Sequence, residues 1–185
     1  MTFRYLSLLA AVIAMSLQNA LPQFDPPEPD SNTALGALSI LPPEYQGYVI
    51  KLSADNGDPD PPQWYVLAYT GSPEEGLFSI TMARGEIVQE KPSLNLGELF
   101  KSPSPIDVER MTIDSPAAFD IASHYAAANG RDLATVSYIL QQTGADSAPV
   151  WQIWCYDRGG RYFGYLEIAA TNGTVISTDD LPSTP

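Results

Sequence analysis

Four side chains with oxygen atoms that could bind a metal ion occur within residues 55–60: Asp55, Asn56, Asp58 and Asp60. A calcium-binding EF-hand loop needs such ligands at alternating positions, with Gly at the sixth and Glu at the twelfth. Counted from Asp55, the sixth residue is Asp60 and the twelfth is Val66, so the pattern fails. The chain has one His and one Cys, too few for a structural zinc site. We therefore expect a solvated turn here, and no metal.

The candidates for acid–base chemistry are equally sparse. His124 follows Asp120 by four residues in a predicted helix, where the two would be surface neighbours. No Gly-x-Ser-x-Gly nucleophile elbow occurs, and no Gly-rich phosphate loop. Glycoside hydrolysis needs two carboxylates across a cleft, and no pattern places such a pair. The sequence predicts no catalytic residue and no cofactor. A hydrolase with a site between two units, using acidic residues and His124, remains an alternative.

Cys155 is the remaining reactive side chain, and it cannot form a disulfide within the chain because it is the only cysteine. It alternates in phase with Trp151 and Ile153, which places all three on one face of a predicted strand. A cysteine on an apolar face is usually a buried, unreactive thiol. We expect that state rather than a catalytic one.

Charge narrows the choice of partners. Twenty-two acidic and nine basic side chains give a formal net charge of −13. Nucleic acid and anionic membrane surfaces both select clustered Lys and Arg, so neither is an expected partner. The length of 185 residues, with 44% apolar side chains, suits one domain or two small ones.

The N-terminus resembles a signal peptide, assigned to residues 1–20. Arg4 supplies the positive start, and the apolar run from Leu6 to Met15 is too short to span a bilayer comfortably. Cleavage after Ser16 or after Ala20 would fit. No cysteine lies there to carry a lipid anchor. The Pro-rich residues 21–30 are expected to form a flexible linker. The mature protein is expected to be exported, periplasmic or extracellular, and not inserted in a membrane.

Strand and helix patterns organise the rest of the chain. Proline, glycine and capping residues mark the element ends, and apolar periodicity of two or of about 3.6 separates strands from helices. Strands are predicted at 45–53, 62–69, 77–82, 135–142, 149–157, 162–170 and 174–177, an extended segment at 106–113, and helices at 31–41, 93–101 and 115–129.

Two of the predicted hairpins resemble each other. Residues Pro62, Trp64, Val66 and Tyr69 match Pro149, Trp151, Ile153 and Tyr156 at a shift of 87, and Ile80, Gly85, Ile87 and Val88 match Ile168, Gly173, Val175 and Ile176 at a shift of 88. This agreement predicts a duplicated unit. The alternative is the similarity that any two hairpins share.

Three features of the second copy resemble the PepSY family: Ile113-Asp-Ser-Pro-Ala-Ala118 opening a helix, Pro149-Val-Trp-Gln-Ile153, and a hairpin ending Ala-Thr-Asn-Gly-Thr-Val-Ile176. The resemblance implies an α+β fold of two helix-plus-antiparallel-sheet units (αβββ, PepSY-like or cystatin-like) in tandem. The first unit with its connector would span 31–105, the second 106–178, and a tail 179–185. It implies a non-enzymatic role, in which the protein inhibits or regulates a peptidase or binds another envelope protein. The tandem also resembles, in architecture only, the β-lactamase inhibitory protein.

Strand alternation then predicts a binding face. If Trp64, Val66, Trp151 and Ile153 face the helices, the opposite face is aromatic, and aromatic side chains are favoured anchors of protein interfaces. The expected partner-binding residues are Tyr65, Tyr69, Trp154, Tyr156, Phe163 and Tyr165. Alternatively the two units pack these faces together, or residues 94–100 cover one of them. A structural envelope protein without a specific partner also remains open, as does the oligomeric state.

Overall fold

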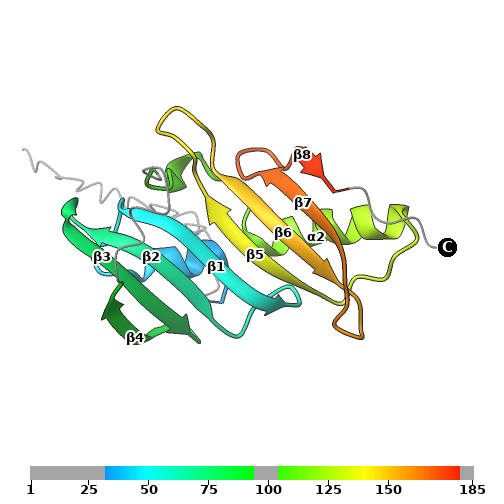
Figure 1. Cartoon of the computed structure of the whole chain (residues 1–185), viewed down its shortest axis with the longest axis horizontal. Helices are drawn as coiled ribbons and strands as arrows, with labels where there is room; N and C mark the ends of the chain where they lie inside the picture. The colour runs from blue at the N-terminus through cyan, green and yellow to red at the C-terminus, as the bar shows by residue number, and fades with distance from the viewer. Residues whose placement is uncertain (1–31, 94–103, 180–185) are drawn as a thin grey trace, which may run out of the picture.

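One antiparallel sheet of eight strands dominates the computed structural model, which describes residues 32–93 and 104–179 (Figure 1). The strand order is β4-β3-β2-β1-β5-β6-β7-β8, so β1 and β5 are central and β4 and β8 are the edges. The strands are β1 Val49–Gly57, β2 Trp64–Thr70, β3 Ser72–Ala83, β4 Glu86–Pro92, β5 Thr135–Gln141, β6 Val150–Tyr156, β7 Tyr162–Ala169 and β8 Val175–Thr178.

Two α-helices lie behind the sheet in Figure 1, on the same face. The short α1 (Ala34–Ser39) is capped by Thr33, whose hydroxyl accepts from the Gly36 amide. The longer α2 (Ser115–Ala128) is capped by Asp114 and has Pro116 in its first turn. A single 3₁₀ turn, η2 (Val108–Arg110), interrupts the segment expected to be extended.

The N-termini of the two helices are joined by hydrogen bonds. The Leu35 amide donates to Asp114 Oδ1 at 3.0 Å, and the buried Ala34 amide donates to Ser115 Oγ at 3.0 Å. Asp114 therefore satisfies an amide on each helix, since it also accepts from Ser115 N. This junction orients both helices on the sheet.

The core lies between the helices and the sheet, and strand alternation fills it. In β5 and β6 every second residue is buried, as expected for strands with one covered face. At its centre the rings of Trp64, Tyr138 and Trp151 contact one another, with centroids 5.7 to 6.5 Å apart. Trp151 is fully buried, and its Nε1 donates to Ile113 O at 2.9 Å. The prediction that Trp64, Val66, Trp151 and Ile153 face the helices is confirmed.

The predicted fold class, two tandem α+β units, is wrong. Strands β1 and β5 pair antiparallel from Lys51↔Gln141 to Ala54↔Tyr138, so both halves of the chain build one continuous sheet. The result is a sheet-dominated fold with a single helix longer than two turns among the described residues.

The residue correspondence behind the predicted duplication also fails in the returning strands. Val66 is paired with Ile80, whereas Ile153 is paired with Leu166 rather than with Ile168. The predicted duplication instead requires Ile80 to correspond to Ile168. Apolar residues alternate with a period of two in both hairpins, so their sequences can be aligned equally well at registers that differ by two residues.

Several predictions fall wholly or largely outside the described residues: the signal peptide, the linker at 21–30, the helix at 93–101 and most of the tail from 179. Within residues 32–93 and 104–179, no helix has the length and apolar character needed to cross a membrane.

Candidate functional site

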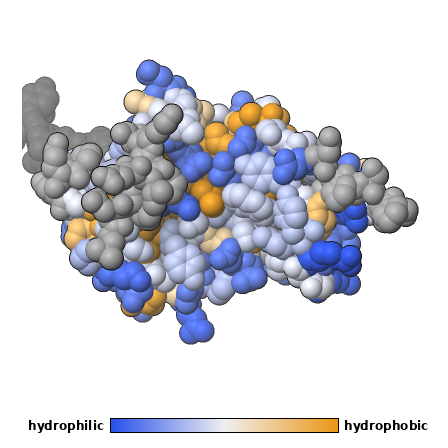
Figure 2. Space-filling view, in the orientation of Figure 1, coloured by the Kyte–Doolittle hydropathy of each residue, from blue (hydrophilic) through white to orange (hydrophobic). Residues whose placement is uncertain are grey.

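The face of the sheet opposite the helices, here called the open face, is turned toward the viewer in Figure 2. Where it is not grey it is mostly pale blue, the colour of residues of intermediate hydropathy, with smaller orange areas between. One row of paired residues crosses six strands there: Thr81, Tyr65, Ser53, Ile139, Gln152 and Glu167. The surface is thus neither a charged face nor a continuous apolar one.

A hydrogen-bonded aromatic cluster occupies the β6–β7 part of this face. The rings of Trp154 and Tyr165, on paired residues, have centroids 5.0 Å apart. Glu167 Oε1 accepts from the Tyr165 hydroxyl at 2.7 Å and from Gln152 Nε2 at 3.1 Å. Partial burial and the bond to Glu167 raise the pKa of Tyr165 above its ordinary value. The Tyr165 hydroxyl is therefore protonated at neutral pH and available to donate to Glu167.

A β-bulge extends the cluster differently from the sequence prediction. Cys155 is paired with Gly164 but Tyr156 with Tyr162, so one extra residue, Phe163, interrupts the alternation of β7. Phe163 is only 6% exposed and belongs to the hydrophobic core, which corrects its predicted place on the open face. Tyr162, 45% exposed, lies beside Tyr156 instead, with ring centroids 6.1 Å apart.

The two tyrosines of β2 form a separate group. Tyr65 is 42% exposed and Tyr69 is half-buried, on the same side of β2. Strands β1 and β5 lie between β2 and β6, so this group is about 14 Å from Trp154, three strand spacings away. Five of the six predicted residues lie on the open face, in two groups rather than in one patch. Gln152 and Tyr162 join them.

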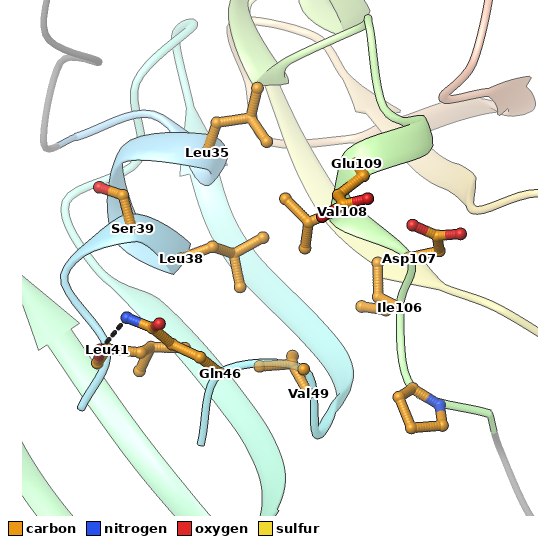
Figure 3. Close-up of a pocket in the computed structure, with 12 residues that line it drawn as sticks. Leu35, Leu38, Ser39, Leu41, Gln46, Val49, Ile106, Asp107, Val108 and Glu109 are labelled. Atoms are coloured by element: carbon orange, nitrogen blue, oxygen red, sulfur yellow. Dashed lines mark hydrogen bonds between the residues drawn. The ribbon is translucent and has the colours of Figure 1, made fainter. Parts of the chain in front are cut away.

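A pocket lies on the opposite side, between α1 and the segment that precedes α2 (Figure 3). Its volume is about 640 Å³. Leu38 on α1 points across it toward Ile106 and Val108. Gln46 lines it as well, and its Nε2 is held by Leu41 O at 2.8 Å. The carboxylate-bearing residues Asp107 and Glu109 also border the pocket.

The residues considered for metal binding and acid–base catalysis are spread over different elements. Asp55 Oδ1 accepts from Ser137 Oγ at 2.7 Å, and Asp58 pairs with Asp60 through the backbone. His124 is exposed on α2, with Nδ1 2.7 Å from the backbone oxygen of Asp120 rather than from its carboxylate. Within the described ranges, no three His, Cys, Asp or Glu side chains are grouped as a metal site would require.

Cys155 matches its prediction. It is 1% exposed, and burial raises the pKa of its thiol from 9.0 to about 12. The thiolate, which is the reactive form, is therefore scarce at neutral pH.

Comparison with known proteins identifies the fold but no family. No family model matches the chain, and no curated protein matches it. Among solved structures, a putative lipoprotein from Clostridium difficile 630 superposes with a TM-score of 0.54 at 15% identity, covering 78% of this chain and 90% of that one. At that identity the similarity extends to the fold alone.

Proposed function

We propose that this chain is an exported, non-enzymatic protein that binds another protein through the open face of its sheet. The observation that carries the proposal is the aromatic cluster of Trp154, Tyr156, Tyr162 and Tyr165, partly exposed on a face that no described helix covers. Large aromatic side chains with little conformational freedom are preferred anchors at protein interfaces.

The hydrogen bonds of the cluster support binding because they reduce the conformational entropy that its side chains lose when a partner binds. Tyr165 is held by Glu167, and Glu167 by Gln152, before any partner arrives. Side chains that are already ordered lose less conformational entropy on association. Ser137, which is paired with Trp154, places a polar side chain beside the cluster, as in the polar rim of an interface.

Export is supported by the N-terminal sequence pattern. The Clostridium difficile protein of similar fold is described as a putative lipoprotein, which points in the same direction. Cell fractionation and N-terminal sequencing of the mature chain test this part. A mature chain that starts after Ser16 or Ala20 supports it, and a cytoplasmic chain that keeps Met1 contradicts it.

The binding proposal is tested by photo-crosslinking in the producing cell. A photoreactive phenylalanine analogue replaces Tyr165 in one variant and Tyr65 in another, and a third carries it at exposed His124 on α2 as the control. We expect one discrete adduct from Tyr165 that disappears when Trp154→Ala is added. The absence of any adduct specific to the open face would favour the structural envelope protein instead.

Inhibition of a peptidase is the finer form of the proposal, and it rests on the PepSY resemblance. Purified protein would be added to thermolysin-like metallopeptidases, and peptide hydrolysis would be followed with and without Trp154→Ala. Inhibition by the wild type that is lost in the variant supports this form. Unchanged hydrolysis contradicts it and leaves the wider binding proposal to the crosslinking result.

A further inference from the structure

We infer that the pocket between α1 and residues 105–109 binds a small amphiphilic cation, with an aliphatic body inside the pocket and an ammonium or guanidinium group at its rim. The site is distinct from the open face, because it is on the side of the sheet that carries the helices.

The shape of the pocket follows from the short helix α1. This helix has 6 residues against 14 in α2, so it covers less of the sheet. The opposite wall is formed by residues 105–109, in which Ile106 N donates to Val49 O at 2.7 Å before the chain enters η2. The space left between them, about 640 Å³, falls within the range of about 300–1,000 Å³ typical of small-molecule sites.

The walls select an apolar body. Six of the residues that line the pocket are aliphatic: Leu35, Leu38, Leu41, Val49, Ile106 and Val108. Leu35 and Val108 are only partly buried, so a ligand would remove further apolar surface of this chain from water. That gain drives insertion of an alkyl chain but does not determine the charge of the ligand.

The rim selects a cation. Asp107 and Glu109 are two residues apart beside the pocket, and neither forms a salt bridge within residues 32–93 and 104–179. The neighbouring cation, Arg110, is directed elsewhere, since its Nη1 donates to Ser147 O at 3.0 Å. The net charge of −13 adds to the attraction of a cation and the repulsion of an anion.

The experiment compares three probes that share one alkyl chain: octylammonium, 1-octanol and octanoate, at pH 7. Methyl resonances of Leu38, Val49 and Val108 are followed by NMR during each titration. We expect saturable shifts with affinity in the order ammonium, alcohol, carboxylate, and a preference for ammonium over octanoate of about fivefold, as for ion pairs at a half-exposed rim. The preference should decrease at high salt.

Two variants separate the walls from the rim. Asp107→Asn with Glu109→Gln should remove most of the preference for ammonium while leaving octanol binding unchanged. The matched control, Glu86→Gln with Asp120→Asn, alters net charge equally at exposed positions of β4 and α2 and should keep the preference. Val108→Phe, which fills the pocket, should weaken all three probes. Absence of saturable shifts with any probe, or a preference that survives Asp107→Asn with Glu109→Gln, would overturn the inference.

Discussion

Two tryptophans three residues apart serve different purposes because strand alternation puts them on opposite faces. Trp151 is fully buried and hydrogen-bonded, whereas Trp154 is half-buried on the open face. Removing a buried aromatic side chain from a core costs about 3–5 kcal/mol. We expect Trp151→Ala to lower the free energy of unfolding by that amount, measured by urea denaturation. Trp154→Ala is the matched control and should cost about 1 kcal/mol. Equal losses from the two substitutions would contradict the faces assigned here.

The fluorescence of Trp154 can also report on the proposed binding face. Trp64 is 2% and Trp151 0% exposed, so collisional quenchers can reach only Trp154 among the three tryptophans of the chain. We expect iodide to quench part of the native fluorescence of the wild type and almost none of that of Trp154→Phe. A bound partner should protect the same fraction. Equal quenching of the two proteins would show that another tryptophan is accessible.

The buried thiol of Cys155 makes stability depend on alkaline pH. Its pKa is about 12 in the folded protein and near 9.0 when unfolded, so above about pH 9 the unfolded chain loses this proton while the folded chain keeps it. The folded state then binds more protons, and stability decreases as pH rises from about 9 to about 12. Tyr45, whose pKa burial and the bond to Glu90 raise to about 12, acts in the same direction.

The Cys155 contribution can be isolated. We expect the free energy of unfolding of Cys155→Ala to decrease less steeply than that of the wild type between pH 9 and pH 11, measured by urea denaturation at fixed ionic strength. Tyr45 is unchanged in this variant, so its contribution cancels in the comparison. Parallel pH profiles would show that the thiol is not protected in the folded state.

Among the elements, one carboxylate accepts hydrogen bonds from the N-terminal turns of both helices. Asp114 accepts from the amides of Ser115, at 2.7 Å, and Leu35, at 3.0 Å, and so joins α2 to α1. Loss of an N-cap side chain costs about 0.5–2 kcal/mol, and the Leu35 amide would lose its partner too. We expect Asp114→Ala to lower the free energy of unfolding by about 2 kcal/mol, and Asp114→Asn, which keeps an accepting oxygen, by less than half of that. Thermal and urea denaturation of both variants measures this. Equal losses of unfolding free energy in Asp114→Ala and Asp114→Asn would contradict the role of Asp114 as a hydrogen-bond acceptor for both helices.

The elements also show how far the sequence predicts this structure. Alternation in residues 150–156 gives the strand and the correct face of each side chain, because burial on one side enforces a period of two. It fails at Phe163, because a bulge inserts a residue without a distinctive local pattern. Gly164 beside it is a weak indication, since glycine in a strand often accompanies a bulge. Tyr162 was missed for the same reason.

Long-range pairing is the part that local patterns could not provide. The strands on either side of the centre are separated by more than seventy residues in sequence, yet Leu52 is paired with Leu140 and Ser53 with Ile139. The interior strands β2, β5 and β6 show the same alternation, so alternation alone does not say which strands are neighbours. The sequence therefore predicts most strands but not that they form one sheet. The pocket was missed because it depends on how much of the sheet α1 covers.

In the whole molecule, the β1–β5 pairing should make folding a single event. Separating the chain between residues 103 and 104 would leave β1 and β5 as unpaired edges, with the buried side chains Leu52 and Ala54 on β1 and Val136 and Leu140 on β5. Long, apolar, unpaired edges favour association with other chains over folding. We expect residues 1–103 and 104–185, produced separately, to show no cooperative thermal transition by circular dichroism.

The intact chain should then unfold in one step. Backbone amide NMR signals of β2, in the β1–β4 half, and of β6, in the β5–β8 half, should give coincident urea transitions. A Leu140→Ala substitution at the centre should move both transitions together, because the side chain lies in the core that the two halves share. Two separated transitions, or a fragment that folds alone, would show that the halves are independent units joined only at their edges.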